Sequence, residues 1–568
     1  MIRKFLLLLS FCMLIFSNAY TQADEDFVGF INRQHHWVDS VFEKLTPKER
    51  IGQLFLVRVR TDSGERYIDS VAEVIRREQL GGLVVFHGEL ARHVEMFNHY
   101  QSLAKVPLLL AFDGEWGLGM RLPGKTISYP FQMTLGAIKQ DTLLYEMGKQ
   151  VAKDFRRMGM HFNFAPVVDV NNNAQNPVIH VRSFGDNKYN VVCKAKAYMN
   201  GLLDGGVIAS LKHFPGHGDT DVDSHKDLPQ LDFSRGRLDS LELFPFRALI
   251  QAGAPAVMVA HMHVPALDAT PHIPASISKQ VVHGLLQQEL GFRGLVVTDA
   301  MDMEGVKKFF PEGEADVMAI LAGNDLIELS ENSARAIELI VEAIRDNHLK
   351  QEEIDRRVKR VLAAKYWLGL DRYRPIDTLG LSTDLNRVEA KCLVQRLADS
   401  AVTVLKSHRT LGEFAYREKT AIVTIGGGQS ELFERDLIKR FPNGKVYVFS
   451  GQETRAEVKR YWSEIQHNRQ LVLVVHDTRS RPGNTIVTTD AINELISQLT
   501  KRNACAVLFT SPYVLDALPL HGVSSIVLGY QNDDFMQKAV LKVFLGDMPA
   551  RGRLPVTVNK HFVYGDGE

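Results

Sequence analysis

Cysteine is scarce in this chain, which has 4 among its 568 residues, at positions 12, 193, 392 and 505. Cys12 falls in a segment that we expect to be removed, so three widely spaced thiols remain in the mature chain. An odd and scattered set matches neither a disulfide framework nor the ligand spacing of a zinc site. The fold must therefore be held together by its hydrophobic core.

An excess of charge of either sign is also missing. Lysine plus arginine and aspartate plus glutamate both total 67, which gives a formal net charge of zero. A balanced chain lacks the electrostatic footprint of proteins that bind nucleic acid, anionic membranes or polyanionic substrates. We therefore expect no nucleic-acid partner.

Long apolar runs are confined to the N-terminus. Two basic residues precede an apolar run from Phe5 to Phe16, and small residues follow at Ala19 and Ala23. This arrangement is typical of a cleaved signal peptide, because the run is shorter than the roughly 20 apolar residues of a membrane span. We predict a signal peptide over residues 1–23, cleavage near Ala19 or Ala23, export to the periplasm or the medium, and no stable membrane insertion.

A repeated unit fills the next 300 or so residues: an amphipathic helix, a glycine, an apolar strand and a polar loop. Met147, Val151 and Phe155 keep helical spacing, for example, and Gly159 follows them. A glycine at the end of a helix and an apolar run after it are typical of a helix that leads into a buried parallel strand. The pattern predicts eight strands, over residues 51–59, 82–86, 108–112, 163–169, 207–211, 256–260, 295–297 and 325–329.

Eight strands that alternate with helices favour an α/β protein with a (β/α)8 TIM-type barrel, and an open doubly wound sheet is the alternative. The helical pattern breaks around residues 372–383, and a second α/β series follows. We predict a barrel over residues 24–372, a linker over 373–385, and a smaller α/β three-layer sandwich domain over 386–568. The strands expected in this second domain cover residues 420–425, 445–449, 471–475, 506–509 and 525–528.

Ionisable residues stand where the apolar strands of the first domain stop. The ends of strands three, five, six and seven carry Asp113, Glu115, Lys212, His213, His261 and Asp299. Ligands of a barrel bind at the C-terminal ends of its strands. These side chains are therefore expected to converge at one mouth.

The segment from Lys212 to His225, KHFPGHGDTDVDSH, is rich in glycine and titratable groups and poor in apolar ones, which is typical of a functional loop. In an extended segment, residues two apart point the same way, so Asp223 and His225 can face one side together. A carboxylate beside an imidazole raises its pKa and fixes its tautomer, which makes a proton donor and acceptor near neutral pH. A structural Asp–His hydrogen bond that holds the loop is the alternative.

Asp299 follows an apolar strand and is a candidate nucleophile. A carboxylate at this place can attack the anomeric carbon of a sugar and form a covalent intermediate. A second group must then protonate the leaving oxygen from the opposite side, and His225 is the candidate for that group. Asp302 lies nearby but points less obviously into the mouth.

These residues resemble glycoside hydrolase family 3, and within it the bacterial β-N-acetylglucosaminidase branch. The long loop motif at 212–225 carries the resemblance, and it extends over nearly the whole mature chain. One departure is that Trp116 and Leu118 stand near places where related sequences often carry a second glycine and an arginine. The supporting motifs are DGEWG at 113–117, NFAPVVD at 163–169, RSF at 182–184, AH at 260–261, PALD at 265–268, VTDAMDM at 297–303 and GRLPVT at 552–557.

The resemblance implies a role for each matching residue. It implies that Asp299 is the nucleophile, that His225 is the acid/base of this branch, and that Asp223 is the partner of His225. His217 and Asp219 are expected to shape the loop. The positions that the resemblance assigns to the hydroxyl groups of the terminal sugar are Asp113, Arg121, Arg182, Lys212 and His213.

The activity that the resemblance implies is that of a retaining exo-β-N-acetylglucosaminidase, a hydrolase of terminal non-reducing β-linked N-acetylglucosamine. The expected partner is a saccharide, from cell-wall muropeptides in peptidoglycan turnover or from chitooligosaccharides, and no cofactor or metal is expected. A β-glucosidase is the nearest alternative. A phosphorylase of the same family is another, because a histidine carries less negative charge than a glutamate and lets phosphate approach the intermediate.

Two readings from other classes stay open at this point. A binding protein that has kept a barrel and lost catalysis would not need Asp299, Asp223 and His225. A metal-dependent barrel hydrolase would use histidines, which are numerous, although barrels of that kind place a His-x-His pair on the first strand rather than after the sixth. The candidate ligands for such a metal are His213, His217, His225, His261 and His263.

Overall fold

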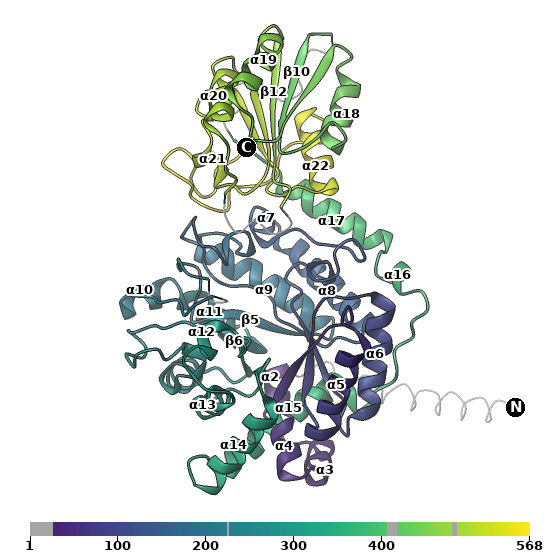
Figure 1. The fold of residues 1–568 in the computed structure, drawn as a ribbon, viewed down its shortest axis with the longest axis vertical. Helices are drawn as coiled ribbons and strands as arrows, with labels where there is room; N and C mark the ends of the chain where they lie inside the picture. Colours follow the sequence, from purple (N-terminus) through teal and green to yellow (C-terminus); the bar gives the residue numbers. More distant parts are fainter. Residues whose placement is uncertain (1–25, 224–225, 406–416, 480–484) are drawn as a thin grey trace, which may run out of the picture.

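The structure is a computed structural model, and it describes residues 26–223, 226–405, 417–479 and 485–568. The predicted signal peptide and His225 lie outside the described residues. Two α/β units follow one another along the chain, and Figure 1 shows the second above the first, with α17 (Val388–Ala401) running between them. No helix in the described part of the chain is long and apolar enough to cross a membrane.

The first unit is built on an eight-stranded parallel sheet that closes on itself. Hydrogen bonds join the strands in the order β7-β6-β5-β4-β3-β2-β1-β8, and a parallel bridge between Val297 and Leu326 brings its two ends together. The prediction of a TIM-type barrel followed by a smaller α/β domain is confirmed, and the open doubly wound sheet is wrong for the first domain. The strands are β1 (Phe55–Val59), β2 (Gly82–Val85), β3 (Leu109–Phe112), β4 (Phe162–Asn163), β5 (Ile208–Phe214), β6 (Ala256–Val259), β7 (Leu295–Thr298) and β8 (Ile327–Glu328).

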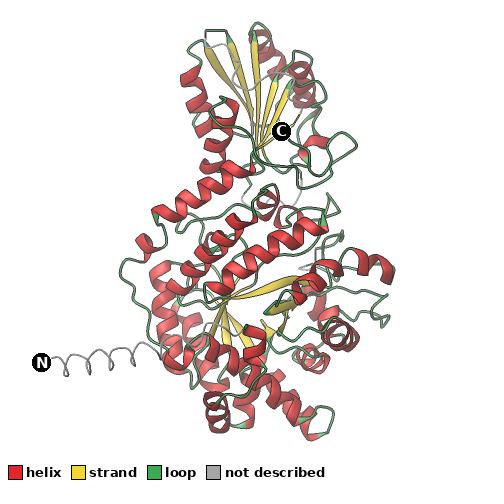
Figure 2. Ribbon diagram, turned by 180° about the vertical axis from the view of Figure 1, so that it is seen from behind, coloured by secondary structure: helices red, strands yellow, loops and turns green. Residues whose placement is uncertain are grey.

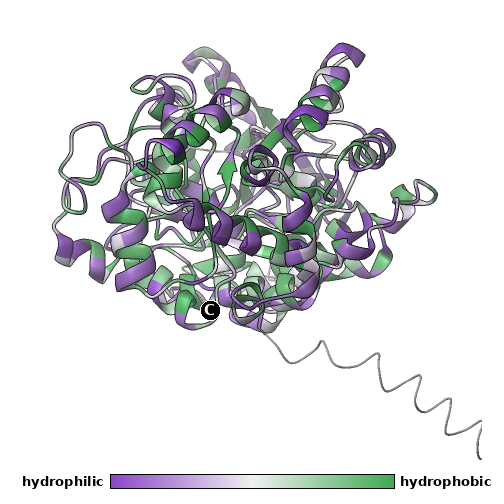
Figure 3. Ribbon diagram, turned by 90° about the horizontal axis from the view of Figure 1, so that it is seen from below, coloured by the Kyte–Doolittle hydropathy of each residue, from purple (hydrophilic) through white to green (hydrophobic). Residues whose placement is uncertain are grey.

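Helices surround the barrel, as Figure 2 shows. The longer ones are α5 (Glu65–Glu78), α6 (Leu90–Leu103), α8 (Asp141–Arg157), α9 (Lys188–Asp204), α11 (Leu243–Gln251), a π-helix (Gln280–Glu289), α13 (Glu314–Ala322), α14 (Ser333–Arg345) and α15 (Gln351–Trp367). Helix α8 is typical, because Met147, Val151 and Phe155 are fully buried along one face. Seen from below, the helices carry both hydrophobic and hydrophilic turns (Figure 3).

Three strands of the first domain depart from their predicted bounds by more than two residues: β1, β4 and β5, which ends at Phe214 rather than at residue 211. The first strand begins at Phe55 rather than at residue 51, because Pro47–Gly52 forms helix α4. Thr46 and Glu49 form a capping box at the start of α4. The apolar run that follows α4 was extended backwards over the end of this helix in the prediction. Strand β4 is regular only over Phe162–Asn163, and Pro166, which lacks an N–H donor, lies in the segment that follows.

The second unit is a three-layer α/β domain. Its sheet has the order β11-β10-β12-β13-β14-β9, in which only β9 (Thr403–Leu405) is antiparallel to its neighbour. Figure 1 shows α18 (Leu432–Arg440) and α22 (Asp534–Phe544) on one face and α19 (Arg455–Ile465) and α20 (Asp490–Thr500) on the other. The sequence pattern missed β9, a short edge strand directly after α17. The parallel strands are β10 (Thr420–Ile425), β11 (Gly444–Phe449), β12 (Gln470–His476), β13 (Cys505–Phe509) and β14 (Ser525–Leu528).

Asp316 on α13 gives the barrel an expected pH-dependent stability. The side chain is buried, Ser330 donates a hydrogen bond of 2.9 Å to it, and burial raises the pKa of Asp316 to about 7. In the unfolded chain the carboxyl ionises near pH 4, so folding costs free energy that grows as the pH rises from 4 to 7. Asp316→Asn is expected to raise the free energy of unfolding on the order of 2–4 kcal/mol at pH 8 and far less at pH 4.

Urea denaturation at both pH values measures this effect. Asp69→Asn, at an exposed position on α5, is the matched control and is expected to change stability at neither pH. An equal gain from Asp316→Asn at pH 4 and pH 8 would show that the carboxyl is not held neutral in the folded state.

Candidate functional site

A cavity of about 440 Å³ opens at the carboxyl ends of the barrel strands. This volume lies in the range of small-molecule sites, and this end of a barrel is where ligands bind. All but one of the predicted site residues line it; the exception, His225, lies outside the described residues. The predicted residues that line the cavity are Asp113, Arg121, Arg182, Lys212, His213, Asp223 and Asp299.

Asp113 follows β3 directly and is held between two cations. Lys212 on β5 donates a hydrogen bond of 2.9 Å to Asp113 Oδ1, and Arg121 pairs with Oδ2. Burial favours the neutral acid, but the charges of Lys212 and Arg121 outweigh it and hold the pKa of Asp113 well below its usual range. Asp113 is therefore an ionised acceptor at the wall of the cavity.

Glu115 continues this ion network, although the sequence predicted no role for it. Its side chain is fully buried and lies 2.9 Å from Lys212 Nζ and 2.7 Å from Arg182 Nη2. Burial raises its pKa, but the charge of Arg182 and then that of Lys212 lower it to about 2. Lys212 in turn keeps its proton, since Asp113 and Glu115 raise its pKa against the effect of burial.

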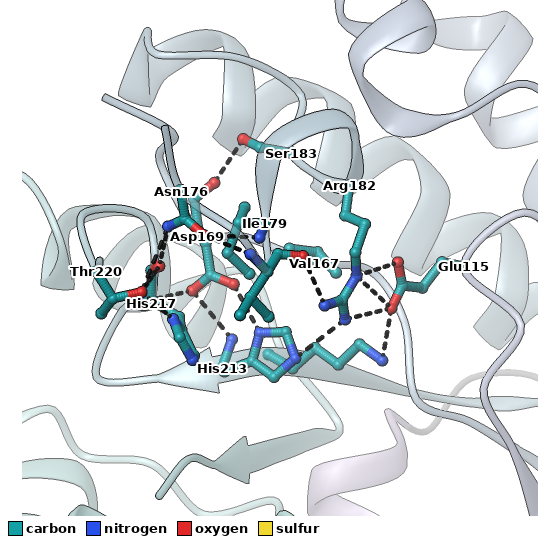
Figure 4. A network of polar contacts seen from close by, with 12 residues as sticks. Glu115, Val167, Asp169, Asn176, Ile179, Arg182, Ser183, His213, His217 and Thr220 are labelled. Carbon is teal, nitrogen blue, oxygen red and sulfur yellow. Dashed lines mark hydrogen bonds and ion pairs between the residues drawn. The ribbon is translucent and has the colours of Figure 1, made fainter. Parts of the chain in front are cut away.

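The network extends from Arg182 to a buried histidine and aspartate, as Figure 4 shows. Arg182 Nη2 lies 3.3 Å from His213 Nε2, and His213 Nδ1 lies 2.7 Å from Asp169 Oδ2. Asp169 Oδ1 also accepts hydrogen bonds from the backbone N–H groups of His213 and His217. Asp169 therefore fixes both the tautomer of His213 and the start of the loop after β5, and the motif at 163–169 was the only signal for it.

His217 and Asp219 hold the loop after β5 in place. His217 Nδ1 is hydrogen-bonded to Thr220 Oγ1 at 2.7 Å, and burial lowers its pKa to about 4, so the ring is neutral. Asp219 accepts hydrogen bonds from Asn172 and Arg237. These contacts agree with the loop-shaping role expected for both residues.

Asp299 follows β7, on the opposite side of the ring of strands from Asp113. Its backbone N–H donates to Val259 O at 2.9 Å, and its Oδ1 accepts from the backbone N–H of Ala300 at 2.8 Å. His261 Nε2 lies 3.0 Å from Ala300 O, so this buried imidazole supports the turn that carries Asp299. The turn that carries this carboxyl group is thus anchored to β6 and to the residue His261 that follows it.

Two histidines that the sequence raised as candidate metal ligands are engaged elsewhere. His261 Nδ1 is hydrogen-bonded to Ser276 Oγ at 2.7 Å, and His263 Nδ1 lies 3.2 Å from Ile273 O. Among the residues that the structure describes, no three His, Cys, Asp or Glu side chains form a group that could hold a metal ion.

Two further acidic residues at the cavity, besides Glu115, were given no role by sequence reasoning. Asp302 pairs with Arg58 of β1 at 2.7 Å. Glu328 is the last residue of β8 and is 4% exposed; its Oε2 is buried without a hydrogen-bond partner among the described residues. The strand-end rule that found Asp299 would have found Glu328 too, had it been applied to the eighth strand.

An aromatic wall joins the cavity to the second domain. The rings of Trp116 and Phe131 meet edge to face at 4.9 Å, and both line the cavity. Gln531 of the second domain accepts hydrogen bonds from Phe131 N at 2.8 Å and from Thr134 Oγ1 at 2.7 Å. The second domain thereby positions one wall of a cavity that otherwise belongs to the barrel.

This site suits a small, neutral ligand rich in hydroxyl groups. Buried charges that are already paired within the protein offer oriented donors and acceptors without needing a charged partner. The carboxyl group of Asp299 across the cavity from them can supply a nucleophile or an electrostatic stabiliser.

Comparison with known proteins gives a consistent result. The model of the family described as "Glycosyl hydrolase family 3 N terminal domain" matches residues 46–364. The chain is similar to Beta-hexosaminidase A of Pseudoalteromonas piscicida, with 29% identity over 94% of this chain and 100% of that protein. It is also similar to a Beta-N-acetylglucosaminidase/beta-glucosidase of Cellulomonas fimi, with 25% identity over 92% of this chain and 95% of that protein.

A solved structure matches at the level of the fold and the sequence together. The structure of a glycoside hydrolase family 3 β-N-acetylglucosaminidase from Paenibacillus sp. str. FPU-7 has a TM-score of 0.76 and 31% identity with this chain. The match covers 91% of this chain and 99% of that one, so it includes both domains.

Proposed function

Because the chain belongs to glycosyl hydrolase family 3, we propose that it is a retaining exo-β-N-acetylglucosaminidase that removes terminal β-linked N-acetylglucosamine. One observation carries this proposal: Asp299, Asp223 and the Asp113–Lys212–Glu115–Arg182 network line the same cavity. The names of the relatives from Pseudoalteromonas piscicida and Paenibacillus support the choice of sugar.

The proposed reaction has two displacements. In the first, Asp299 attacks C1 of the sugar, the bond from C1 to the leaving oxygen breaks, and protonated His225 gives its proton to that oxygen. In the second, His225 takes a proton from water, the water oxygen bonds to C1, and the bond from C1 to Asp299 breaks. Two inversions at C1 leave the β configuration unchanged. Asp223 would steady the imidazolium form of His225.

The ion network has the proposed task of holding the sugar. Asp113 accepts hydrogen bonds from sugar hydroxyl groups, Lys212, Arg182 and Arg121 donate to their oxygens, and His213 lines the same wall beside Arg182. Charge-assisted hydrogen bonds of this kind are stronger than neutral ones, and leaving one unpaired in a buried site is costly.

Aryl glycosides test the activity directly. Turnover of an aryl β-N-acetylglucosaminide is expected to exceed that of the matching β-glucoside, and NMR is expected to show the β-anomer as the first product. A first product in the α configuration would overturn the retaining mechanism. A preference for the glucoside would favour a β-glucosidase, the second activity in the name of the Cellulomonas fimi relative. Formation of a sugar 1-phosphate in phosphate buffer would favour a phosphorylase.

We also propose that the enzyme is exported and acts on muropeptides or chitooligosaccharides outside the cytoplasm. The N-terminal residues that predict a signal peptide support export. Release of N-acetylglucosamine from purified peptidoglycan fragments, compared with release from chitooligosaccharides at equal concentration, identifies the preferred source. Recovery of the full-length chain in the cytoplasmic fraction would contradict export.

His225→Ala is expected to separate substrates by the quality of their leaving group. For a disaccharide, whose leaving oxygen needs a proton, turnover is expected to fall by about 10²–10⁴-fold. For a dinitrophenyl glycoside, which leaves without a proton, the first displacement is expected to change far less. His99→Ala, at an exposed position on α6, is the matched control. Equal losses on both substrates would contradict the acid role of His225.

A further inference from the structure

Glu328 at the end of β8 is, with Asp302, one of the two acidic groups that line the cavity in the described part of the chain and have no use in the proposed mechanism. It lines the cavity, it is 4% exposed, and its Oε2 is buried without a partner among the described residues. Its backbone is well anchored, because its N–H donates to Thr298 Oγ1 at 3.0 Å and its carbonyl accepts from Met301 N. The side chain is thus placed rigidly at the wall of the sugar site.

A structural role does not account for this side chain. Buried carboxyl groups in folded proteins are hydrogen-bonded or paired with a cation, because an unmet oxygen costs stability. The nearby Asp113 and Asp302 have such partners in Lys212 and Arg58. Within the part of the chain that the structure describes, no side chain is hydrogen-bonded to or paired with Glu328 in this way, and an unmet polar group at the wall of a cavity is one that a bound ligand can satisfy.

Burial and the nearby charges favour the neutral form of Glu328. Burial is the largest effect, and the charges of Asp113 and Asp299 add to it, so the pKa of Glu328 lies well above its usual range. Asp302 acts in the same direction, and Lys212 acts against it. A carboxyl that stays protonated has an O–H donor as well as acceptor oxygens, which suits a neutral hydroxyl group.

The order of strands indicates which edge of the sugar Glu328 meets. Between Asp299 after β7 and Asp113 after β3, one arc of the ring carries Lys212 and His213, with Arg182 beside them. The other arc, through β8, β1 and β2, carries Glu328 with the paired Arg58 and the ring of Phe86. With C1 at Asp299, one edge of a hexopyranose bears the substituents at C2 and C3, and the other bears the ring oxygen and the hydroxymethyl group on C5. The arc with Lys212 matches the first edge. The other arc, where the guanidinium groups of Arg58 and Arg121 each lie 4.9 Å from the centre of the Phe86 ring and Glu328 keeps a spare carboxyl, matches the second.

We propose that Glu328 is a specificity-determining residue whose carboxyl group hydrogen-bonds the C5 hydroxymethyl group of the bound sugar. The CH2 of that group packs against the arc that holds Phe86, and its hydroxyl meets Glu328. This inference rests on the proposed function only in assuming that a hexopyranose binds with C1 at Asp299. The wild-type pocket then selects sugars with a 6-hydroxyl group. It disfavours the 6-deoxy sugar, which lacks the hydroxyl group, and the uronic acid, whose carboxylate would face several acidic side chains.

The test compares aryl β-N-acetylglucosaminide with its 6-deoxy analogue in wild type, Glu328→Leu and Glu328→Gln. A site that hydrogen-bonds a hydroxyl group rejects the analogue that lacks it by several powers of ten. For wild type, the kcat/KM of the 6-hydroxyl substrate is therefore expected to exceed that of the 6-deoxy analogue by about 10²-fold or more. Glu328→Leu is expected to reduce that ratio to within about tenfold of unity, and Glu328→Gln, which keeps a donor and an acceptor, is expected to preserve most of it. Thermal unfolding of each variant shows that it is folded, and Glu338→Gln, at an exposed position on α14, is the control.

Two outcomes would overturn the inference. One is that Glu328→Leu keeps the wild-type ratio of kcat/KM between the 6-hydroxyl substrate and its 6-deoxy analogue. The other is a change confined to the ratio between the N-acetylglucosaminide and the glucoside, which would place Glu328 at C2 instead. Failure of the proposed function is seen separately, in wild type, as a preference for another sugar. Since glucose carries the same 6-hydroxyl group, the Glu328 comparison is then made on the glucoside and its 6-deoxy form.

Discussion

Asp299→Ala is expected to reduce kcat by about 10⁴-fold or more while leaving the fold intact. Nucleophiles that form covalent intermediates have effects of this size, because without them the substrate must react with water directly. The backbone N–H of Asp299 still reaches Val259 O in the variant, and the side-chain hydrogen bond from Ala300 N that is lost lies within the same turn. Thermal unfolding is therefore expected to change little.

Azide gives this variant a second readout. A small anion that enters the space left by the carboxylate attacks C1 from the same face, so an activated aryl substrate is expected to give the α-glycosyl azide. Asp302→Ala is the matched control, because Asp302 lines the same cavity but is paired with Arg58. Recovery of substantial activity in Asp299→Ala without azide, or an equal loss in Asp302→Ala, would contradict the assignment of Asp299 as nucleophile.

The barrel could be predicted from the sequence because its signal is local and repeated. Each strand is an apolar run after a helix that ends near a glycine, and Gly159, with a φ of 72° after α8, shows why that residue is needed there. Where competing local signals overlap, the boundaries shift, as at Pro47–Gly52, where a capped helix precedes an apolar strand. The antiparallel edge strand β9 has only three residues, too few for any periodicity to appear.

The strand-end rule found the residues of the site but not how they are paired. That Lys212 lies between Asp113 and Glu115 depends on β3 and β5 being separated by one strand in the closed ring, a relation that no local pattern contains. The same holds for Asp169, which acts through His213. Gln531 lies 400 residues beyond Phe131, the residue whose backbone it holds, so a single sequence gives no signal for that contact.

Lys212→Met is expected to have the largest combined effect on activity and stability. Lys212 is 2% exposed and lies 2.9 Å from carboxylate oxygens of both Asp113 and Glu115. Its removal leaves two buried anions, with Arg121 and Arg182 as their remaining cations, and breaking a buried ion pair in this way costs about 3–5 kcal/mol. The loss of a charged donor to the sugar is expected to lower kcat/KM by about 10²-fold or more, measured on an aryl glycoside, because hydrogen bonds to charged groups are strong in buried sites.

The double variant Glu115→Gln with Lys212→Met separates the two effects. Removing the charge of the fully buried Glu115 takes away one of the two anions that shared Lys212, so the double variant is expected to unfold at a higher urea concentration than Lys212→Met alone. The donor to the sugar is still missing, so kcat/KM is expected to stay low. Were activity to return together with stability, Lys212 would be a residue that only holds the fold.

Because the charges of Lys212 and Glu115 are fixed by each other across the neutral range, neither group is expected to set the pH limits of turnover in wild type. Those limits are then left to the proton carrier at His225, and the bell-shaped pH profile of kcat/KM should lose the limb due to that group in His225→Ala.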